Sequence, residues 1–214
     1  MANPLVVGIT GGSAAGKTTF ARALVEAMPD VRCTILNQDR YFRDWSDYPP
    51  DQREGVRTAN HPRAVLWERL VEHVGTLAAG GAIEEPVSGT RARSQGLTVE
   101  RHQAGDLVVV EGHLILGCEP LRDLLNLKIY LDVDPHERVL RRLLRDTSGE
   151  RGGNLETAVA WYRRDVLPNF PVHTEPSRRH ADLVVPFDRG NEVAIQLLAA
   201  GLRDMLGVQN TGEK

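Results

Sequence analysis

The chain has 214 residues, of which 41% are hydrophobic and 26% charged, and its formal net charge is −3. This length suits one α/β domain with a sizeable core, and the slightly acidic balance excludes a basic surface for nucleic acid. The two cysteines, Cys33 and Cys118, lack metal-ligand spacing and suggest no disulfide framework, so each is interpreted as a small buried side chain. The first apolar run, Leu5–Ile9, is too short for a signal peptide or a membrane span, and we therefore expect a cytoplasmic protein without a membrane partner.

Strand and helix patterns alternate along the chain. Short β-branched runs predict strands, and apolar residues at helical spacing predict helices. Asp134 begins one helix with a cap, followed by Pro135 and then Glu137. This alternation predicts a parallel sheet covered by helices on both faces. In chain order we expect a strand at 5–9, a helix at 17–28, a strand at 33–36, a helix at 65–77, strands at 107–110 and 127–133, a helix from 134, a strand at 183–185 and a helix at 193–206.

The segments between these elements differ in composition. Residues 37–62 are polar and rich in Asp, Arg and Pro, which indicates a long functional loop with some helix. Residues 83–105 alternate short runs with turns, and we expect a β-hairpin outside the main sheet. Residues 1–206 are predicted to form a single domain, and the polar tail 207–214 is expected to fray.

A glycine-rich motif follows the first predicted strand. Gly11-Gly12-Ser13-Ala14-Ala15-Gly16-Lys17-Thr18 fits G-x-x-x-x-G-K-[ST] at every fixed position, and Thr19 continues it into the first helix. Backbone N–H groups in such a loop surround phosphates, and the helix N-terminus adds a positive dipole. We therefore predict a P-loop that binds ATP, with Lys17 reaching the β- and γ-phosphates and the Thr18 hydroxyl on Mg²⁺.

The phosphate loop alone does not distinguish a kinase from other P-loop proteins. The chain has no Asn-Lys-x-Asp motif of GTPases and no Leu-Ser-Gly-Gly-Gln signature of transporter ATPases, and it is short for a helicase core. The apolar run 107–110 ends in Glu111, which places a carboxylate at the carboxyl end of a central strand, where it could act on the metal or its waters. This pattern favours a small-molecule kinase.

Further blocks follow the phosphate loop in a fixed order: Asn37-Gln38-Asp39-Arg40-Tyr41-Phe42, Asn60-His61-Pro62, Val110-Glu111-Gly112-His113-Leu114, residues 141–146, Leu167-Pro168 and residues 175–186. With these blocks the chain resembles the uridine/cytidine kinases and their phosphoribulokinase relatives from about residue 6 to residue 186. The resemblance implies ATP with Mg²⁺, a small-molecule acceptor, and a homo-dimer or homo-tetramer. It also implies that Asp39 is the catalytic base and helps to hold the magnesium shell, a role that suits a carboxylate.

Arginines are frequent in the helix that begins at Asp134. One interpretation is a solvated face opposite the apolar residues Val139, Leu140, Leu143 and Leu144. The resemblance instead implies a lid at about 142–154, in which Arg142, Arg145 and Arg151 meet the transferred phosphoryl group and Arg145 is catalytic. Gly149, Gly152 and Gly153 would let this segment swing. Arg138 and Arg141 are interpreted as structural or solvent-facing.

The acceptor side departs from the family pattern. Asn60 stands where these enzymes have Asp, residues 86–93 lack their aromatic and His side chains, Gly153 replaces an Arg, and Trp161 replaces a Gln. Arg91 and Arg93 either favour an anionic acceptor or form a solvated hairpin tip, and Trp161 either stacks on a ring or packs in its helix. The predicted acceptor contacts are Tyr41, Asn60, His61, Arg93, Arg142 and Trp161.

Three functions remain open from the sequence. The first is a kinase for the 5′-hydroxyl of a pyrimidine nucleoside or a ribosyl analogue. The second is a kinase of the same fold for another small alcohol, such as a sugar, a sugar phosphate or a hydroxy acid, because losing partners for one substrate discriminates against it. The third is a catalytically silent nucleotide-binding regulator.

Overall fold

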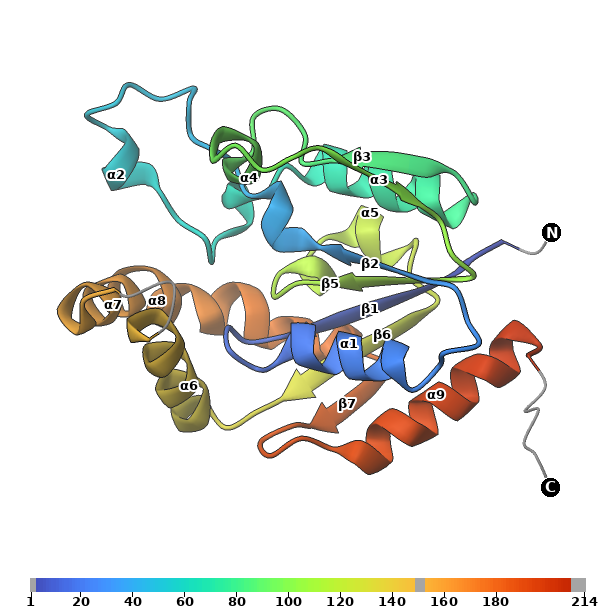
Figure 1. Ribbon diagram of the computed structural model, residues 1–214. Coiled ribbons are helices and arrows are strands. Elements are labelled where there is room, and N and C mark those ends of the chain that lie inside the picture. Colours follow the sequence, from blue (N-terminus) through green and yellow to red (C-terminus); the bar gives the residue numbers. More distant parts are fainter. Residues whose placement is uncertain (1–2, 149–152, 209–214) are drawn as a thin grey trace.

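Five parallel strands form the main sheet of the computed structural model, which describes residues 3–148 and 153–208 (Figure 1). Their order across the sheet is β2-β5-β1-β6-β7. Every residue of β5 is buried, as expected for a central strand that both faces of the sheet cover. The strands are β1 (Leu5–Gly11), β2 (Cys33–Asn37), β5 (Leu107–Glu111), β6 (Leu127–Asp132) and β7 (Leu183–Pro186).

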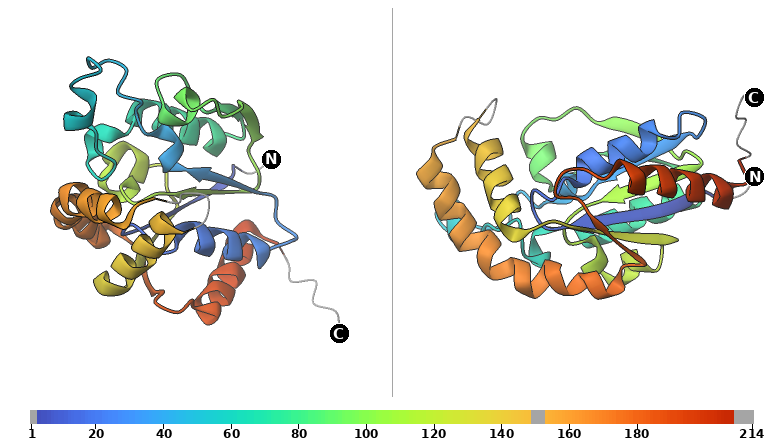
Figure 2. Two further views of the ribbon diagram at one scale, coloured as in Figure 1. Left: turned by 60° about the vertical axis from the view of Figure 1, so that its left-hand side comes forward. Right: turned by 90° about the horizontal axis from the view of Figure 1, so that it is seen from below.

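Helices cover both faces of this sheet, as the sequence predicts (Figure 1, Figure 2). Helices α1 (Lys17–Glu26) and α9 (Glu192–Leu206) pack on one face, and α3 (Trp67–Ala78) and α5 (Glu119–Arg122) pack on the other. Neighbouring strand residues alternate between the two cores, because successive side chains of a strand point to opposite faces. Val108 and Val110 belong to the core under α3, whereas Leu107 and Val109 belong to the core under α1.

The remaining elements lie in the connections. Strands β3 (Ala82–Glu85) and β4 (Glu100–Gln103) pair antiparallel outside the main sheet, as predicted. The long polar loop contains short helices. Helix α6 (Pro135–Thr147) and the helices α7 and α8 lie beyond the carboxyl ends of the strands (Figure 1). The short elements are η1 (Gln38–Tyr41), α2 (Arg53–Val56), η2 (Pro62–Ala64), α4 (Arg91–Ser94), η3 (Ile115–Gly117), α7 (Leu155–Trp161), η5 (Tyr162–Val166), α8 (Leu167–Asn169), η6 (Phe170–Thr174) and η7 (Glu175–His180).

Helix α6 (Pro135–Thr147) buries two of its four arginines, contrary to an arginine face that is wholly solvated. Arg138 and Arg142 are buried, whereas Leu140 and Leu144 are 58% and 67% exposed. Arg138 lies 4.0 Å above the Phe170 ring, a cation–π contact that accounts for its structural role. The apolar residues of α6 therefore do not mark its inner face.

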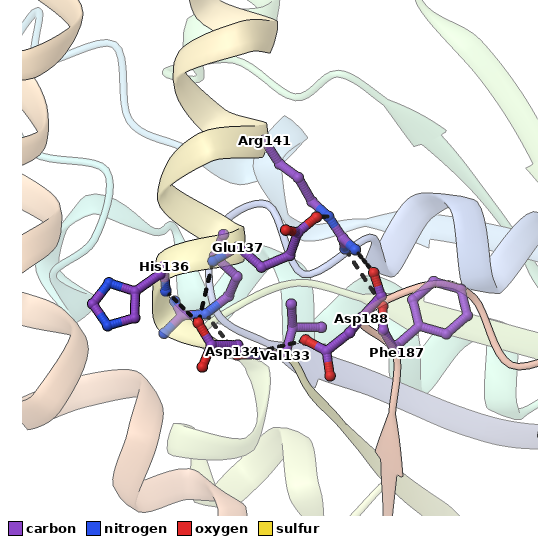
Figure 3. A network of polar contacts seen from close by, with 8 residues as sticks. Val133, Asp134, His136, Glu137, Arg141, Phe187 and Asp188 are labelled. Atoms are coloured by element: carbon purple, nitrogen blue, oxygen red, sulfur yellow. Dashed lines mark hydrogen bonds and ion pairs between the residues drawn. The ribbon is translucent and has the colours of Figure 1, made fainter.

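The N-terminus of α6 begins where the sequence predicts it (Figure 3). The Asp134 carboxylate accepts hydrogen bonds from the backbone N–H groups of His136 and Glu137. Arg141 pairs with Glu137 at 2.8 Å and donates to the carbonyl oxygens of Phe187 and Asp188, and these contacts tie α6 to the segment after β7.

Gly105 packs directly against backbone, and we expect Gly105→Ala to lower the free energy of unfolding by about 3 kcal/mol. A Cβ atom there would lie 2.1 Å from the Arg32 carbonyl oxygen. This oxygen accepts the N–H groups of Asp106 and Leu107, so it cannot move without losing both hydrogen bonds. Urea denaturation measures the change. Gly201→Ala is the control, since nothing lies within 4 Å of its added Cβ atom, and an equal effect of both variants would contradict the prediction.

Glu85 is a buried carboxylate at the end of β3, where its side chain is 4% exposed. Its Oε1 lies 3.3 Å from Arg40 Nε and 3.3 Å from His102 Nε2. Burial raises the pKa of Glu85 to about 7, which the positive charge of Arg40 opposes and the charge of Glu100 reinforces. This carboxyl group therefore titrates near neutral pH in the folded protein.

The raised pKa of Glu85 predicts a pH-dependent stability difference between Glu85→Gln and the unsubstituted protein. The folded state holds the proton of Glu85 more tightly than the unfolded chain does. The stabilising contribution of this group to the free energy of unfolding is therefore lost as pH rises from about 4.5 to about 7. Across this window, the stability of Glu85→Gln relative to the unsubstituted protein should increase by roughly 2 kcal/mol. Urea denaturation at several pH values tests this, with the exposed neighbour as control in Glu84→Gln. Parallel pH curves for Glu85→Gln and the unsubstituted protein would contradict it.

Candidate active site

The predicted phosphate loop connects β1 to α1. Gly16, the residue before the helix, has φ +85°, a left-handed conformation that glycine adopts without strain. Helix α1 begins without a side-chain cap and without an acidic residue in its first turn, and all of its residues are among those that the structure describes. Its N–H groups and positive dipole are therefore available to an anion.

Lys17 is half-buried at the start of α1, and its side chain contacts the phosphate loop. Its Nζ donates to the carbonyl oxygens of Gly11 at 3.2 Å and Gly12 at 3.0 Å. Burial lowers the pKa of Lys17, and the negative charges of Glu111 and Asp39 oppose that shift. A phosphate group in the loop would add negative charge beside this ammonium group.

Glu111 lies at the carboxyl end of β5, in register with Asn37 on β2. Its Oε1 accepts hydrogen bonds from Thr18 Oγ1 and Asn37 Nδ2, both at 2.7 Å. Burial raises the pKa of Glu111, whereas the charge of Lys17 and the bond from Thr18 lower it. Parallel strands end at the same edge of a sheet, which explains why residues so distant in sequence meet here.

The oxygen atoms at this edge match the ligands that Mg²⁺ prefers. The Thr18 hydroxyl and the Glu111 carboxylate are in contact, and Asp39 lines the same cavity. Within residues 3–148 and 153–208, no group of three or more His, Cys, Asp or Glu side chains could hold a metal ion by itself. Such a site suits Mg²⁺, which proteins bind through one or two carboxylates together with substrate phosphates.

A cavity of about 710 Å³ joins this edge of the sheet to the acceptor-side loops. The phosphate loop and Asp39 line one part of it, and Asn60 and Trp161 line another. Asp39 is exposed to the cavity, and its backbone N–H donates to Asn37 Oδ1 at 2.7 Å. The complete lining is Ser13, Ala14, Gly16, Lys17, Thr18, Thr19, Asn37, Asp39, Phe42, Glu54, Arg57, Ala59, Asn60, Arg91, Glu111, His113, Arg141, Arg142, Arg145, Asp146, Thr157 and Trp161.

Two of the three predicted lid arginines line the cavity from α6. Arg142 donates from Nη1 to Ser13 Oγ at 2.6 Å, which connects α6 to the phosphate loop. Burial lowers the pKa of Arg142, and its partner Asp146 at 3.2 Å opposes that shift. Arg145 also contacts Asp146, at 3.0 Å. Arg151, with Gly149 and Gly152, lies outside the described residues, so the lid stays a prediction.

The other predicted site residues divide into two groups. Asn60 and Trp161 line the cavity, but Tyr41, His61 and Arg93 do not. The Tyr41 hydroxyl contacts His73 Nδ1 at 2.7 Å inside the core, because its aromatic ring is buried under α3. His61 packs against the His173 ring, and Arg93 is exposed on a separate surface groove. The carbonyl oxygens of Gly11 and Gly12 accept hydrogen bonds from Lys17 Nζ, and Ala15 is buried in the core.

The structure adds cavity residues that the sequence prediction omitted. His113 is buried, and its Nε2 lies 2.9 Å from the Ala59 carbonyl oxygen, which accepts a hydrogen bond from it. Burial and the charge of Lys17 lower the pKa of His113 to about 4, so its ring is neutral near pH 7. His113 belongs to the sequence block that contains Glu111, and this position could have identified it as a cavity residue. Phe42 ends the sequence block that contains Asp39, whereas Arg57 belongs to no such block and carried no comparable signal.

A model of the Phosphoribulokinase / Uridine kinase family matches residues 6–195. The chain belongs to this family. It is 36% identical over 204 residues to a uridine kinase of Ligilactobacillus salivarius (strain UCC118), covering 95% of this chain and 94% of that one. A uridine kinase of Geobacillus sp. (strain WCH70) is 38% identical over 204 residues, covering 95% of both chains. The solved phosphoribulokinase from Rhodobacter spheroides superposes with a TM-score of 0.58 at 16% identity, covering 91% of this chain and 74% of that one.

Membership of the phosphoribulokinase/uridine kinase family confirms two predictions from the sequence. The fold is that of a P-loop kinase, with a parallel sheet covered on both faces. The protein is a kinase of the class that phosphorylates nucleosides and small alcohols, and the family implies ATP as its phosphoryl donor. In the part of the chain that the structure describes, every helix is too short or too polar to cross a bilayer.

Proposed function

We propose that this protein transfers the γ-phosphoryl group of ATP to the 5′-hydroxyl of a nucleoside, either a pyrimidine nucleoside or a ribosyl analogue. The observation that carries the proposal is the continuity of one cavity from the phosphate loop through Asp39 to Asn60 and Trp161. Uridine kinases that are 36% and 38% identical over nearly the whole chain support the nucleoside class.

The proposed reaction uses the chain's own residues as follows. Asp39 orients the acceptor hydroxyl and takes its proton while the new P–O bond forms and the bond from the γ-phosphorus to the β-phosphate oxygen breaks. Lys17 and Arg145 stabilise the negative charge on the transferred group and on the departing ADP. Thr18, Glu111 and Asp39 would hold Mg²⁺, which supplies further positive charge when bound.

A second candidate acceptor is an anionic alcohol, such as a sugar phosphate or a hydroxy acid. Arg57 and Arg91 both line the acceptor part of the cavity. The Arg91 guanidinium lies 5.2 Å from the centre of the Phe42 ring, and that of Arg57 lies 5.8 Å from the centre of the Trp161 ring. The two aromatic rings that could stack on a base thus already contact arginine side chains. The positive charges of these arginines favour an anionic group beside them.

An acceptor panel tests these alternatives. Purified protein is incubated with ATP and Mg²⁺, and ADP release is followed with uridine, cytidine, other ribonucleosides, ribose, pentose phosphates, glycerate and pantothenate. Turnover with uridine or cytidine supports the nucleoside proposal. Turnover restricted to pentose phosphates or glycerate supports the anionic alternative and overturns the nucleoside proposal. No product from any acceptor would favour the catalytically silent regulator.

A further inference from the structure

A buried carboxylate lies behind the acceptor part of the cavity and takes no part in the proposed chemistry. Asp165 belongs to the π-helical turn Tyr162–Val166 and is 2% exposed. It is separated by more than 100 residues from the loop at 58–60, yet its side chain contacts this loop. π-Helical turns inside longer helices are frequent at functional sites.

Three donors from the loop converge on the Asp165 carboxylate. Its Oδ1 accepts the Thr58 hydroxyl, and its Oδ2 accepts the Ala59 backbone N–H at 3.0 Å and the Asn60 side-chain Nδ2 at 2.6 Å. Thr58 and Asn60 are themselves buried, at 7% and 4% exposed. A buried carboxylate with this many donors forms charge-assisted hydrogen bonds, which hold the loop in one arrangement.

These contacts determine which atom of Asn60 is available to a ligand. An ionised carboxylate only accepts hydrogen bonds, so the amide must turn its Nδ2 toward Asp165. Asn60 lines the cavity, and within the described residues its Oδ1 has no hydrogen-bond partner. The atom that remains for the acceptor is therefore Oδ1, which accepts a hydrogen bond and does not donate one.

We propose that Asp165 is a positioning residue that orients Asn60 so that its Oδ1 accepts a hydrogen bond from a hydroxyl group of the acceptor substrate. This inference rests on the proposed function, because it concerns the same cavity. It assigns the chemistry of one subsite: the group bound next to Asn60 is a hydroxyl and not an anion. The negative charge of Asp165 also favours the protonated form of Arg142 on α6, which couples the loop to that helix electrostatically.

The first test is Asp165→Asn with uridine as the probe acceptor. The new amide lets the Asn60 side chain reverse and present N–H groups to the cavity, so the KM for uridine should rise about tenfold or more. The KM for ATP and kcat should stay within about threefold of their original values. Asn169→Ala is the matched control, since it removes the 2.7 Å bond from Asn169 Nδ2 to the Asp165 backbone oxygen but leaves the carboxylate intact.

The second test exchanges the two side chains in the double variant Asn60→Asp with Asp165→Asn. The carboxylate then lies at position 60, and the amide at position 165 donates a hydrogen bond to it. A side-chain oxygen of residue 60 that accepts hydrogen bonds therefore faces the cavity again. The KM for uridine should return to within about threefold of the original value. A double variant that is as impaired as Asp165→Asn, or a single variant in which both KM values change equally, would overturn the positioning role.

The Asn60 amide also provides a readout that does not depend on activity. In ¹⁵N-labelled protein, its side-chain N–H that is donated to Asp165 should exchange slowly with solvent deuterium, and exchange should accelerate in Asp165→Asn. If the original protein phosphorylates no acceptor in the panel, the proposed function fails and this exchange measurement alone decides the orientation of Asn60. Fast exchange in the original protein would reject the inference whatever its activity.

Discussion

Asp39→Asn should lower kcat by about three orders of magnitude and leave ATP affinity nearly unchanged. Asp39 lines the cavity between the phosphate loop and Asn60, where an acceptor hydroxyl would meet the γ-phosphoryl group. Asparagine keeps the shape of the side chain but cannot take the hydroxyl proton. Steady-state kinetics with the best acceptor of the panel give kcat, and equilibrium titration gives the affinity for ATP.

The control for this prediction is Asp51→Asn in the same polar loop. Asp51 is exposed and does not line the cavity, so its substitution should leave kcat unchanged. Near-normal turnover of Asp39→Asn would remove Asp39 as the base. A large loss in both variants would indicate damage to the loop and not to the chemistry.

Lys17→Met should reduce kcat/KM for ATP by about a hundredfold to a thousandfold. Methionine keeps an unbranched side chain that ends one atom short of the ammonium nitrogen, and it removes the positive charge beside the loop carbonyl oxygens. The same charge lowers the pKa of Glu111, so its loss should also make that carboxylate harder to ionise. Initial rates at varied ATP concentration measure the effect.

Lys128→Met is the matched control for this substitution. Lys128 lies on β6, pairs with Asp182 at 3.0 Å and does not line the cavity. Its substitution should leave kcat/KM for ATP within about threefold of the original value. The prediction is wrong if Lys17→Met retains activity in that same range.

The acceptor side shows why local sequence could not predict the whole site. Asn60 was identified from its place before His61-Pro62, but the residue that orients it is Asp165, more than 100 positions later. Tyr41 is next to Arg40 in the block that contains Asp39, yet its ring turns into the core under α3. Nearness in a motif gives no information on side-chain direction once a short helix begins.

Helix α6 shows both what local sequence predicts and what it does not. Its start at Asp134 follows from a local hydrogen-bond pattern, and the structure confirms it. Its inner face does not follow from apolar spacing, because the helix buries Arg138 and Arg142 and exposes Leu140 and Leu144. The phosphate loop and the Phe170 ring provide partners for these arginines, and those partners come from other parts of the chain.

The sequence by itself determined the strands and the phosphate loop, because each depends on residues that are neighbours in the chain. It also determined the kinase family, which is recognised from short blocks in a fixed order. A β-branched run, a glycine-rich turn and a helix cap act over a few residues, and they need no tertiary partner to be recognised. Only the tertiary structure decided which side chains share the cavity and which atoms they present. Buried polar groups must find partners wherever the fold brings them, as Glu111 does with Thr18 and Asp165 does with Asn60.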